Sequence, residues 1–193
     1  TEVGQEVGRF YGWDYQGLIT TQAQLDNLNE EGRLLHNKLE QQKLDQDPQY
    51  KADFREPGTW FYQDGAQVGD CYYSDVNGDG QVNGEDQTVL GSGLPSVNFG
   101  LSAHLEYKIF DLSISTFGAL GYHVTDYLFN TLNSSYGYGN KSVDILNANQ
   151  WDGGTYVSSI PRTYLSNSAS LPWNDLFCER QIQNAAYWKI ANI

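Results

Sequence analysis

Residues 97–107 show the clearest pattern in the chain. Apolar side chains occupy every odd position from Val97 to Tyr107, and polar residues or glycine occupy the even positions between them. Residues 111–122 alternate in a similar way, and the stretch YKIFD between the two runs suits a tight turn. Because successive side chains of a β-strand point to opposite faces, this pattern predicts a long antiparallel hairpin with one apolar face.

The length of this hairpin bears on its surroundings. At ~3.3 Å per residue, residues 97–107 extend over ~36 Å, and a tilt of ~40° leaves ~28 Å of height. That height is close to the ~25 Å apolar band of an outer-membrane barrel. Tyr107 and Phe110 stand at one end and Tyr122 at the other, where interfacial aromatic residues gather. A long soluble hairpin with one face on a core is the alternative that periodicity leaves open.

Two further segments predict regular structure. Residues 7–15 alternate as a strand, and another strand is expected to begin near Ala185. Residues 21–46 have leucines at helical spacing after a possible capping box, in which Thr21 is followed by Gln24. Gly32 is expected to split this stretch into a short helical hairpin on the surface, and a helix that binds a partner is the alternative.

The remaining sequence predicts two long loops, over residues 20–95 and 123–184. Compact soluble domains rarely contain loops longer than ~12–15 residues, whereas outer-membrane barrels combine short turns at one end with long loops at the other. The chain begins at Thr1 without methionine and ends on the strand-like YWKIANI, so we expect a piece of a longer protein. The predicted fold class is all-β: residues 1–193 form part of one antiparallel transmembrane β-barrel, with about four long strands, at 1–19, 96–122 and 185–193.

Charge narrows the classes of partner. The 193 residues include 11 Lys and Arg against 24 Asp and Glu, which gives a formal net charge of −13. Nucleic acid requires clustered basic residues, so no nucleic-acid partner is predicted. An acidic, tyrosine-rich chain suits a surface that binds cations or faces sugars. No apolar run approaches the ~20 residues of a membrane-spanning helix.

The stretch SDVNGDGQVNGED, residues 74–86, predicts a metal site. Calcium takes 6–8 oxygen ligands, and a 12-residue loop supplies them from positions 1, 3, 5, 7 and 12, with glycine at position 6. Counting from Asp75 places Gly80 at the sixth position. An ion-free turn rich in Asn and Asp is the alternative. The expected ligands of a structural Ca²⁺ are Asp75, Asn77, Asp79, Gln81 through its carbonyl, and Asp86.

Catalytic signals are weak. The three histidines, His36, His104 and His123, have no metal-ligand spacing, and the chain has no nucleophile elbow or phosphate loop. We therefore predict that the chain is not an enzyme. Cys71 and Cys178 fit no zinc spacing, so one disulfide or two buried thiols are both open. The rival function is a secreted, calcium-stabilised module, either dockerin-like or a glycan-binding sandwich, although the second metal loop of a dockerin is missing.

Three segments also carry a resemblance to a known family. They are FYGWDYQGLI at residues 10–19, the block from GDCYYSDVNGDG to STFGALG at residues 69–121, and NAAYWKIANI at residues 184–193. In this order they resemble the C-terminal barrel region of the SusC/RagA family, which are TonB-dependent outer-membrane transporters of Bacteroidota. The chain departs from the family pattern at Cys71, where an aliphatic residue is usual, and at Ala186 and Trp188.

The resemblance implies a location and a task. Residues 97–107 would descend to a periplasmic turn and residues 111–122 would ascend, which places both long loops and the calcium loop outside the cell. The transporter would import glycan or peptide fragments with a SusD-like lipoprotein and would engage TonB through parts absent from this chain. Cys71 and Cys178 would lie on the same side, within reach of a disulfide. Loop aromatics would either stack on sugar rings or pack within the loops, and the candidate ligand-binding residues are Tyr136, Tyr138, Trp151 and Trp173.

Overall fold

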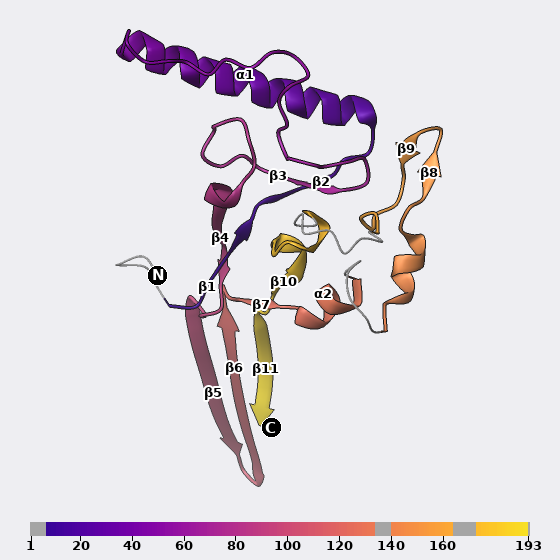
Figure 1. Cartoon of the computed structure of the whole chain (residues 1–193). Helices are drawn as coiled ribbons and strands as arrows, with labels where there is room; N and C mark the ends of the chain where they lie inside the picture. The colour runs from indigo at the N-terminus through magenta and orange to yellow at the C-terminus, as the bar shows by residue number, and fades with distance from the viewer. Residues whose placement is uncertain (1–6, 134–139, 164–172, 193) are drawn as a thin grey trace.

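The computed structural model describes residues 7–133, 140–163 and 173–192. Two regions are plain in Figure 1: a three-stranded sheet extends away from a folded body, and a long helix lies across the far end of that body. We call the described residues before Val97 and between Leu120 and Tyr187 the body. The N-terminal end of the described chain lies near the junction of the two regions, and the C-terminal end lies along the sheet (Figure 1).

The sheet confirms the predicted hairpin. Its strands are β5 (Val97–Tyr107), β6 (Phe110–Leu120) and β11 (Tyr187–Asn192). The strand order is β11-β6-β5, with both pairs antiparallel. Tyr107 pairs with Phe110 across the tight turn, where Lys108 has a positive φ of 58°. The described part of the chain shows an open sheet of three strands and no closed barrel.

Short strands in the body continue the long ones beyond the sheet. β4 (Gln87–Ser92) leads into β5, β7 (His123–Thr125) follows β6, and β10 (Ile182–Asn184) precedes β11. β4 pairs with β1 (Arg9–Trp13), which places the predicted N-terminal strand, and β10 pairs with β7. The other elements are β2 (Tyr15–Leu18), β3 (Cys71–Tyr73), β8 (Trp151–Asp152), β9 (Thr155–Tyr156), α2 (Tyr127–Asn133), and the 3₁₀ turns η1 (Gly84–Asp86), η2 (Val143–Asn147), η3 (Trp173–Asp175) and η4 (Glu179–Gln181).

The expected helical hairpin is wrong, because α1 is one continuous helix over Gln22–Gln46. Its N-cap is as predicted: the Thr21 side chain accepts a hydrogen bond from the backbone N–H of Gln24. Gly32 is buried within the helix, and a Cβ built there would lie 2.4 Å from the carbonyl oxygen of Gly80. The glycine therefore permits a close approach between α1 and the acidic loop, and it does not end the helix. Among the described helices, none has the length and apolar character needed to cross a bilayer.

The two predicted loops pack together into the body instead of remaining separate. Its buried centre draws on both: Cys71, Tyr73 and Val82 come from the first, and Leu176 and Cys178 from the second. The side-chain oxygen of Asn174 accepts a hydrogen bond of 2.7 Å from the backbone N–H of Cys71, 103 positions earlier. Residues that periodicity assigned to loops thus share one hydrophobic core.

Candidate functional site

The sheet has one continuous apolar face. Because residues paired across antiparallel strands share a face, the register places the apolar side chains of all three strands together. They remain exposed within the described structure: Leu101 is 65% exposed, Leu105 63% and Trp188 70%. A soluble monomer seldom leaves a large apolar patch uncovered. The face consists of Val97, Phe99, Leu101, Ala103, Leu105, Tyr107, Phe110, Leu112, Ile114, Leu120, Trp188 and Ile190.

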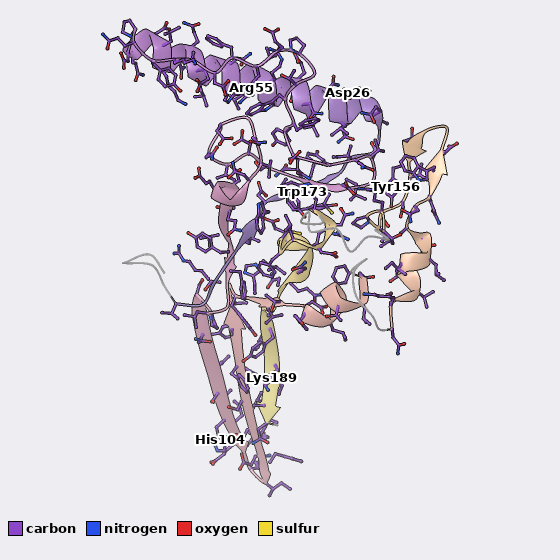
Figure 2. The ribbon with its side chains drawn as sticks, viewed as in Figure 1. Asp26, Arg55, His104, Tyr156, Trp173 and Lys189 are labelled. Atoms are coloured by element: carbon purple, nitrogen blue, oxygen red, sulfur yellow. The ribbon has the colours of Figure 1, made fainter. Side chains whose placement is uncertain are left out.

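The opposite face of the sheet is polar toward the turn, whereas Phe117, Ala119 and Tyr187 lie on it toward the body. Ser102 and Ser115 share a hydrogen bond of 2.9 Å between their hydroxyls. Near the turn, His104 Nε2 lies 3.0 Å from Glu106 Oε1, and His104 Nδ1 lies 3.3 Å from Asp111 Oδ1. Figure 2 shows His104 near the tip of the hairpin. This is the one group of three potential metal-ligand atoms within 4.8 Å that the described residues form, and all three side chains are exposed.

The acidic loop folds around the carboxylate of Asp75. That carboxylate accepts hydrogen bonds from the backbone N–H groups of Gly78 at 2.6 Å, Asp79 at 3.2 Å and Gly80 at 2.7 Å. Asn77 Oδ1 accepts from the N–H of Asp79, and Asp79 Oδ1 accepts from the N–H of Gln81, both at 2.8 Å. The side chains at positions 1, 3 and 5 are therefore turned back onto the loop.

Asp86 closes the loop from its far end. Its side chain is fully buried, and Oδ1 accepts from the N–H groups of Val76 at 2.9 Å and Asn77 at 3.2 Å. Burial raises the pKa of Asp75, and the carboxylates of Asp86 and Asp79 raise it further. A bound cation would relieve this concentration of negative charge. The donor set therefore suits calcium, although the three carboxylates do not gather within 4.8 Å of one another in this structure.

α1 holds the acidic loop in place. Gly80, with φ of 89°, lies against Gly32, and its carbonyl accepts a hydrogen bond of 2.7 Å from Trp60 Nε1. The Trp60 ring in turn stacks on His36 of α1 at a centroid distance of 4.2 Å. The loop therefore rests on a surface built from the helix and an aromatic residue of the following segment.

A buried ion pair joins the two halves of the body, and the sequence patterns did not predict it. Asp70 is fully buried and accepts from Arg162 Nε and, at 3.0 Å, from Arg162 Nη2. Asn174 Nδ2 donates to the same carboxylate at 3.1 Å. These residues are 92 and 104 positions from Asp70, so no local pattern connects them. The one sign in the sequence that Asp70 matters was that Gly69 and Asp70 both match the SusC/RagA pattern.

The predicted ligand-binding residues have different surroundings. Trp173 packs against the hydrophobic core, and its Nε1 donates to the carbonyl of Asp64 at 2.7 Å, so its ring supports the fold. Trp151 is 50% exposed on β8 and meets Tyr156 edge-on, with centroids 5.2 Å apart. Tyr136 and Tyr138 lie outside the described residues.

Cys71 and Cys178 are free, buried thiols in this structure, which is one of the two states that the sequence left open. Burial raises the pKa of Cys71 to about 12 and also raises the pKa of Cys178. Arg180 Nη1 donates to Cys71 Sγ at 3.3 Å and opposes this shift. Because the thiolate is the reactive form, the raised pKa values make both thiols less reactive toward oxidants.

The comparisons with known proteins agree with this arrangement. No family model matches the chain. TonB-dependent receptor P26 of Formosa agariphila is 31% identical over 131 residues, which cover 63% of this chain and 13% of that protein. TonB-dependent receptor P3 of the same organism is 24% identical over 159 residues, which cover 82% of this chain and 12% of that protein.

This chain is similar to two TonB-dependent receptors over part of its length. It corresponds to about an eighth of the length of either relative. The similarity supports the broad family that the resemblance named, and the narrower SusC/RagA assignment stays a prediction.

Proposed function

We propose that the chain is part of an outer-membrane transporter and that β5, β6 and β11 belong to the wall of its barrel. The observation that carries this proposal is the uncovered apolar face of the sheet, opposite a face that is polar over its half nearer the turn. In a bilayer the apolar face meets lipid and the polar face lines the lumen, while every backbone group is satisfied by a neighbouring strand. Neither face then requires a soluble core.

The orientation follows from the two ends of the sheet. In bacterial barrels the short turns face the periplasm and the long connections face outward. The turn at Lys108 and Ile109 is therefore periplasmic, and the body lies outside the cell. β4, β7 and β10 extend the wall above the membrane and support the body.

The substrate and partners belong to the same proposal. The transporter imports glycan or peptide fragments together with a SusD-like lipoprotein, and it draws on TonB through other parts of the protein. The resemblance to SusC/RagA transporters supports these partners, and the similarity to two TonB-dependent receptors supports the link to TonB.

Two matched arginine substitutions in the full-length protein test the wall. Leu101→Arg places a charge on the lipid side, where it costs about 2–4 kcal/mol near the bilayer midplane. Ser102→Arg places the same charge on the polar side of the adjacent position. We expect folded, heat-modifiable protein in the outer membrane to fall strongly for Leu101→Arg and to persist for Ser102→Arg. Equal behaviour of the two variants would contradict a lipid-facing strand.

The acidic loop binds one structural calcium ion in this proposal. Asp75, Asn77, Asp79 and Asp86 supply side-chain oxygens, and Gln81 supplies its carbonyl. The hydrogen bond from the N–H of Gly80 to Asp75 supports this assignment, because it bends the loop at the glycine of position 6. The ion would stiffen the loop against α1.

Calcium titration of the full-length protein tests this assignment. We expect calcium to slow proteolysis within residues 74–86 and Asp75→Asn to abolish that protection. Glu85→Gln is the matched control, because Glu85 lies at position 11 of the loop, outside the ligand set. Protection that is equally strong in Asp75→Asn would place the ion elsewhere.

A further inference from the structure

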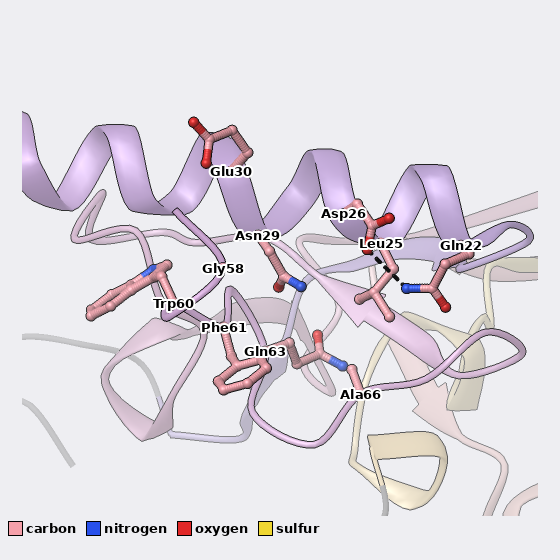
Figure 3. Close-up of a pocket in the computed structure, with 10 residues that line it drawn as sticks. All are labelled: Gln22, Leu25, Asp26, Asn29, Glu30, Gly58, Trp60, Phe61, Gln63 and Ala66. Atoms are coloured by element: carbon pink, nitrogen blue, oxygen red, sulfur yellow. Dashed lines mark hydrogen bonds between the residues drawn. The ribbon is translucent and has the colours of Figure 1, made fainter. Parts of the chain in front are cut away.

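A cavity of about 370 Å³ lies between α1 and the segment that follows it. Leu25 and Asn29 reach from α1 toward the segment that carries Phe61 and Gln63 (Figure 3). The volume is near the lower end of the ~300–1,000 Å³ typical of ligand pockets, so it suits a small ligand or one unit of a longer chain. The full lining is Gln22, Leu25, Asp26, Asn29, Glu30, Gly58, Trp60, Phe61, Gln63 and Ala66.

The polar groups of this cavity differ in how far they are already engaged. Gln63 is buried, and its side-chain amide donates a hydrogen bond to the carbonyl of Cys71 and accepts one from the N–H of Tyr73. It therefore has no free polar group for a ligand and only forms part of the cavity wall. Asn29 Oδ1 accepts a hydrogen bond of 3.0 Å from the N–H of Tyr62, whereas its Nδ2 makes no hydrogen bond to another described residue. Asp26 uses Oδ1 to accept from Gln22. A donor on Asn29 and an acceptor on Asp26 thus remain for a ligand.

Charge restricts the ligand. No lining residue is cationic, so an anionic group would find no partner and would meet two carboxylates. Glu30 is already bound to Arg33 through both oxygens, at 2.8 and 2.6 Å, which leaves one unpaired carboxylate, Asp26. This single charge at the rim is a weak site for a cation. The lining therefore favours an uncharged ligand that is rich in hydroxyl groups.

An aromatic ring completes the lining. Trp60 is held by Gly80 and His36, but the Phe61 side chain is 52% exposed. An exposed ring beside a buried leucine and free amide and carboxylate groups provides both an apolar platform and directional hydrogen bonds. The C–H face of a pyranose ring and its hydroxyls match these two features.

We propose that this cavity binds one uncharged saccharide unit, with its ring against Phe61 and its hydroxyls on Asn29 and Asp26. The proposal deepens the transport function above and rests on it only for the source of the sugar. It adds a sugar-binding site on the body and restricts the bound sugar unit to one without carboxylate or sulfate groups.

Binding to the purified full-length protein tests the site. The probes are a set of uncharged sugars (glucose, galactose, mannose, xylose and cellobiose), digalacturonate and a lysine dipeptide, with Trp fluorescence and calorimetry as readouts. We expect at least one uncharged sugar to bind, without sensitivity to salt, and digalacturonate not to bind. Phe61→Ala should weaken that binding about tenfold, the effect of losing ~1.4 kcal/mol.

Phe54→Ala is the matched control. Phe54 is 48% exposed in the same segment and does not line the cavity, so its removal should leave the affinity unchanged. Asp26→Asn keeps an oxygen for Gln22 but replaces the free acceptor with an amide donor, so it should weaken sugar binding, though less than Phe61→Ala does. Three results would overturn the proposal: no sugar binds, Phe61→Ala and Phe54→Ala behave alike, or the lysine dipeptide binds best and is lost in Asp26→Asn. None of these results would change the outcome expected for Leu101→Arg and Ser102→Arg. The sugar site can therefore be disproved while the barrel wall stands, and the reverse also holds.

Discussion

The body and the sheet differ in whether their apolar side chains are buried. In the body, Tyr73, Cys71 and Ile19 are fully buried, and long polar connections are tied together by side chains from distant parts of the chain. In the sheet, Leu101 and Leu105 are more than half exposed although β5 pairs with β6 along its whole length. The body thus supplies its own core, whereas the apolar face of the sheet stays uncovered by the described residues.

Removing the buried ion pair should separate the two regions most clearly. Arg162→Ala leaves Asp70 buried without its cation, and breaking a buried pair costs about 3–5 kcal/mol. We expect hydrogen exchange to accelerate at β3 and around Asn174 in the full-length protein, while exchange in β5 and β6 stays unchanged. Faster exchange in the sheet as well would show that the two regions unfold as one unit.

The control for this change is Arg55→Ala. Arg55 pairs with Asp53 on the surface, where both side chains are about half exposed. Exposed pairs contribute about 0–1 kcal/mol, so the body should keep its protection.

A smaller effect is expected where α1 meets the acidic loop. Gly32→Ala gains about 1 kcal/mol of helix propensity, but its Cβ would lie 2.4 Å from the Gly80 oxygen, and such overpacking costs about 1–3 kcal/mol. We expect a net loss of up to about 2 kcal/mol in the local stability of residues 75–86, measured by hydrogen exchange.

Gly84→Ala is the control in the same loop, because a Cβ there meets nothing within 4 Å. If Gly32→Ala stabilised the body instead, Gly32 would not mark a tight contact.

The smallest effect should appear only in acid, at the C-terminal half of α1. Glu40 accepts hydrogen bonds from Lys43 Nζ and from the N–H of Asp53, both at 2.8 Å, and these contacts lower its pKa from 4.5 to about 2. A carboxyl with a lowered pKa stabilises the fold above its unfolded pKa. That contribution is lost as the pH falls from about 4.5 toward 2.

We therefore expect residues 50–53 to detach from α1 over this pH range, as followed by proteolysis or exchange. Glu40→Gln should weaken the contact at neutral pH and remove this acid dependence, whereas Glu31→Gln, exposed on the same helix, should change neither. Unchanged acid dependence in Glu40→Gln would assign the transition to another group.

The same two regions differ in how far the sequence predicted them. The hairpin was predictable because Val97 to Tyr107 alternates without interruption, and strand geometry converts that pattern directly into two faces. The predicted break at Gly32 was wrong because helix propensity treats glycine as unfavourable inside a helix. Here the close contact between α1 and Gly80 requires a residue without a side chain. Asp70, Arg162 and Asn174 were missed because their pairing depends on how two distant connections pack.

The candidate sites show the same limit. The acidic loop was predicted because its candidate ligand residues follow one another at fixed spacing, and calcium binding there stays a prediction. Trp173 packs against the core, which the sequence did not predict, and ligand binding by its ring stays a prediction. The cavity beside Phe61 was not predicted, since its lining comes from a helix and a later segment that no spacing rule connects.

The most direct test of the central claim is the accessibility of spin labels along β5 in the full-length protein in lipid. Single cysteines at Leu101→Cys, Ser102→Cys and Ala103→Cys would be labelled, with the unsubstituted protein showing whether the buried Cys71 and Cys178 stay unreactive. Collisions with oxygen, which partitions into lipid, should dominate at positions 101 and 103, and collisions with a water-soluble nickel chelate should dominate at 102. Access by the nickel chelate at all three positions would contradict a membrane wall and favour a water-exposed sheet.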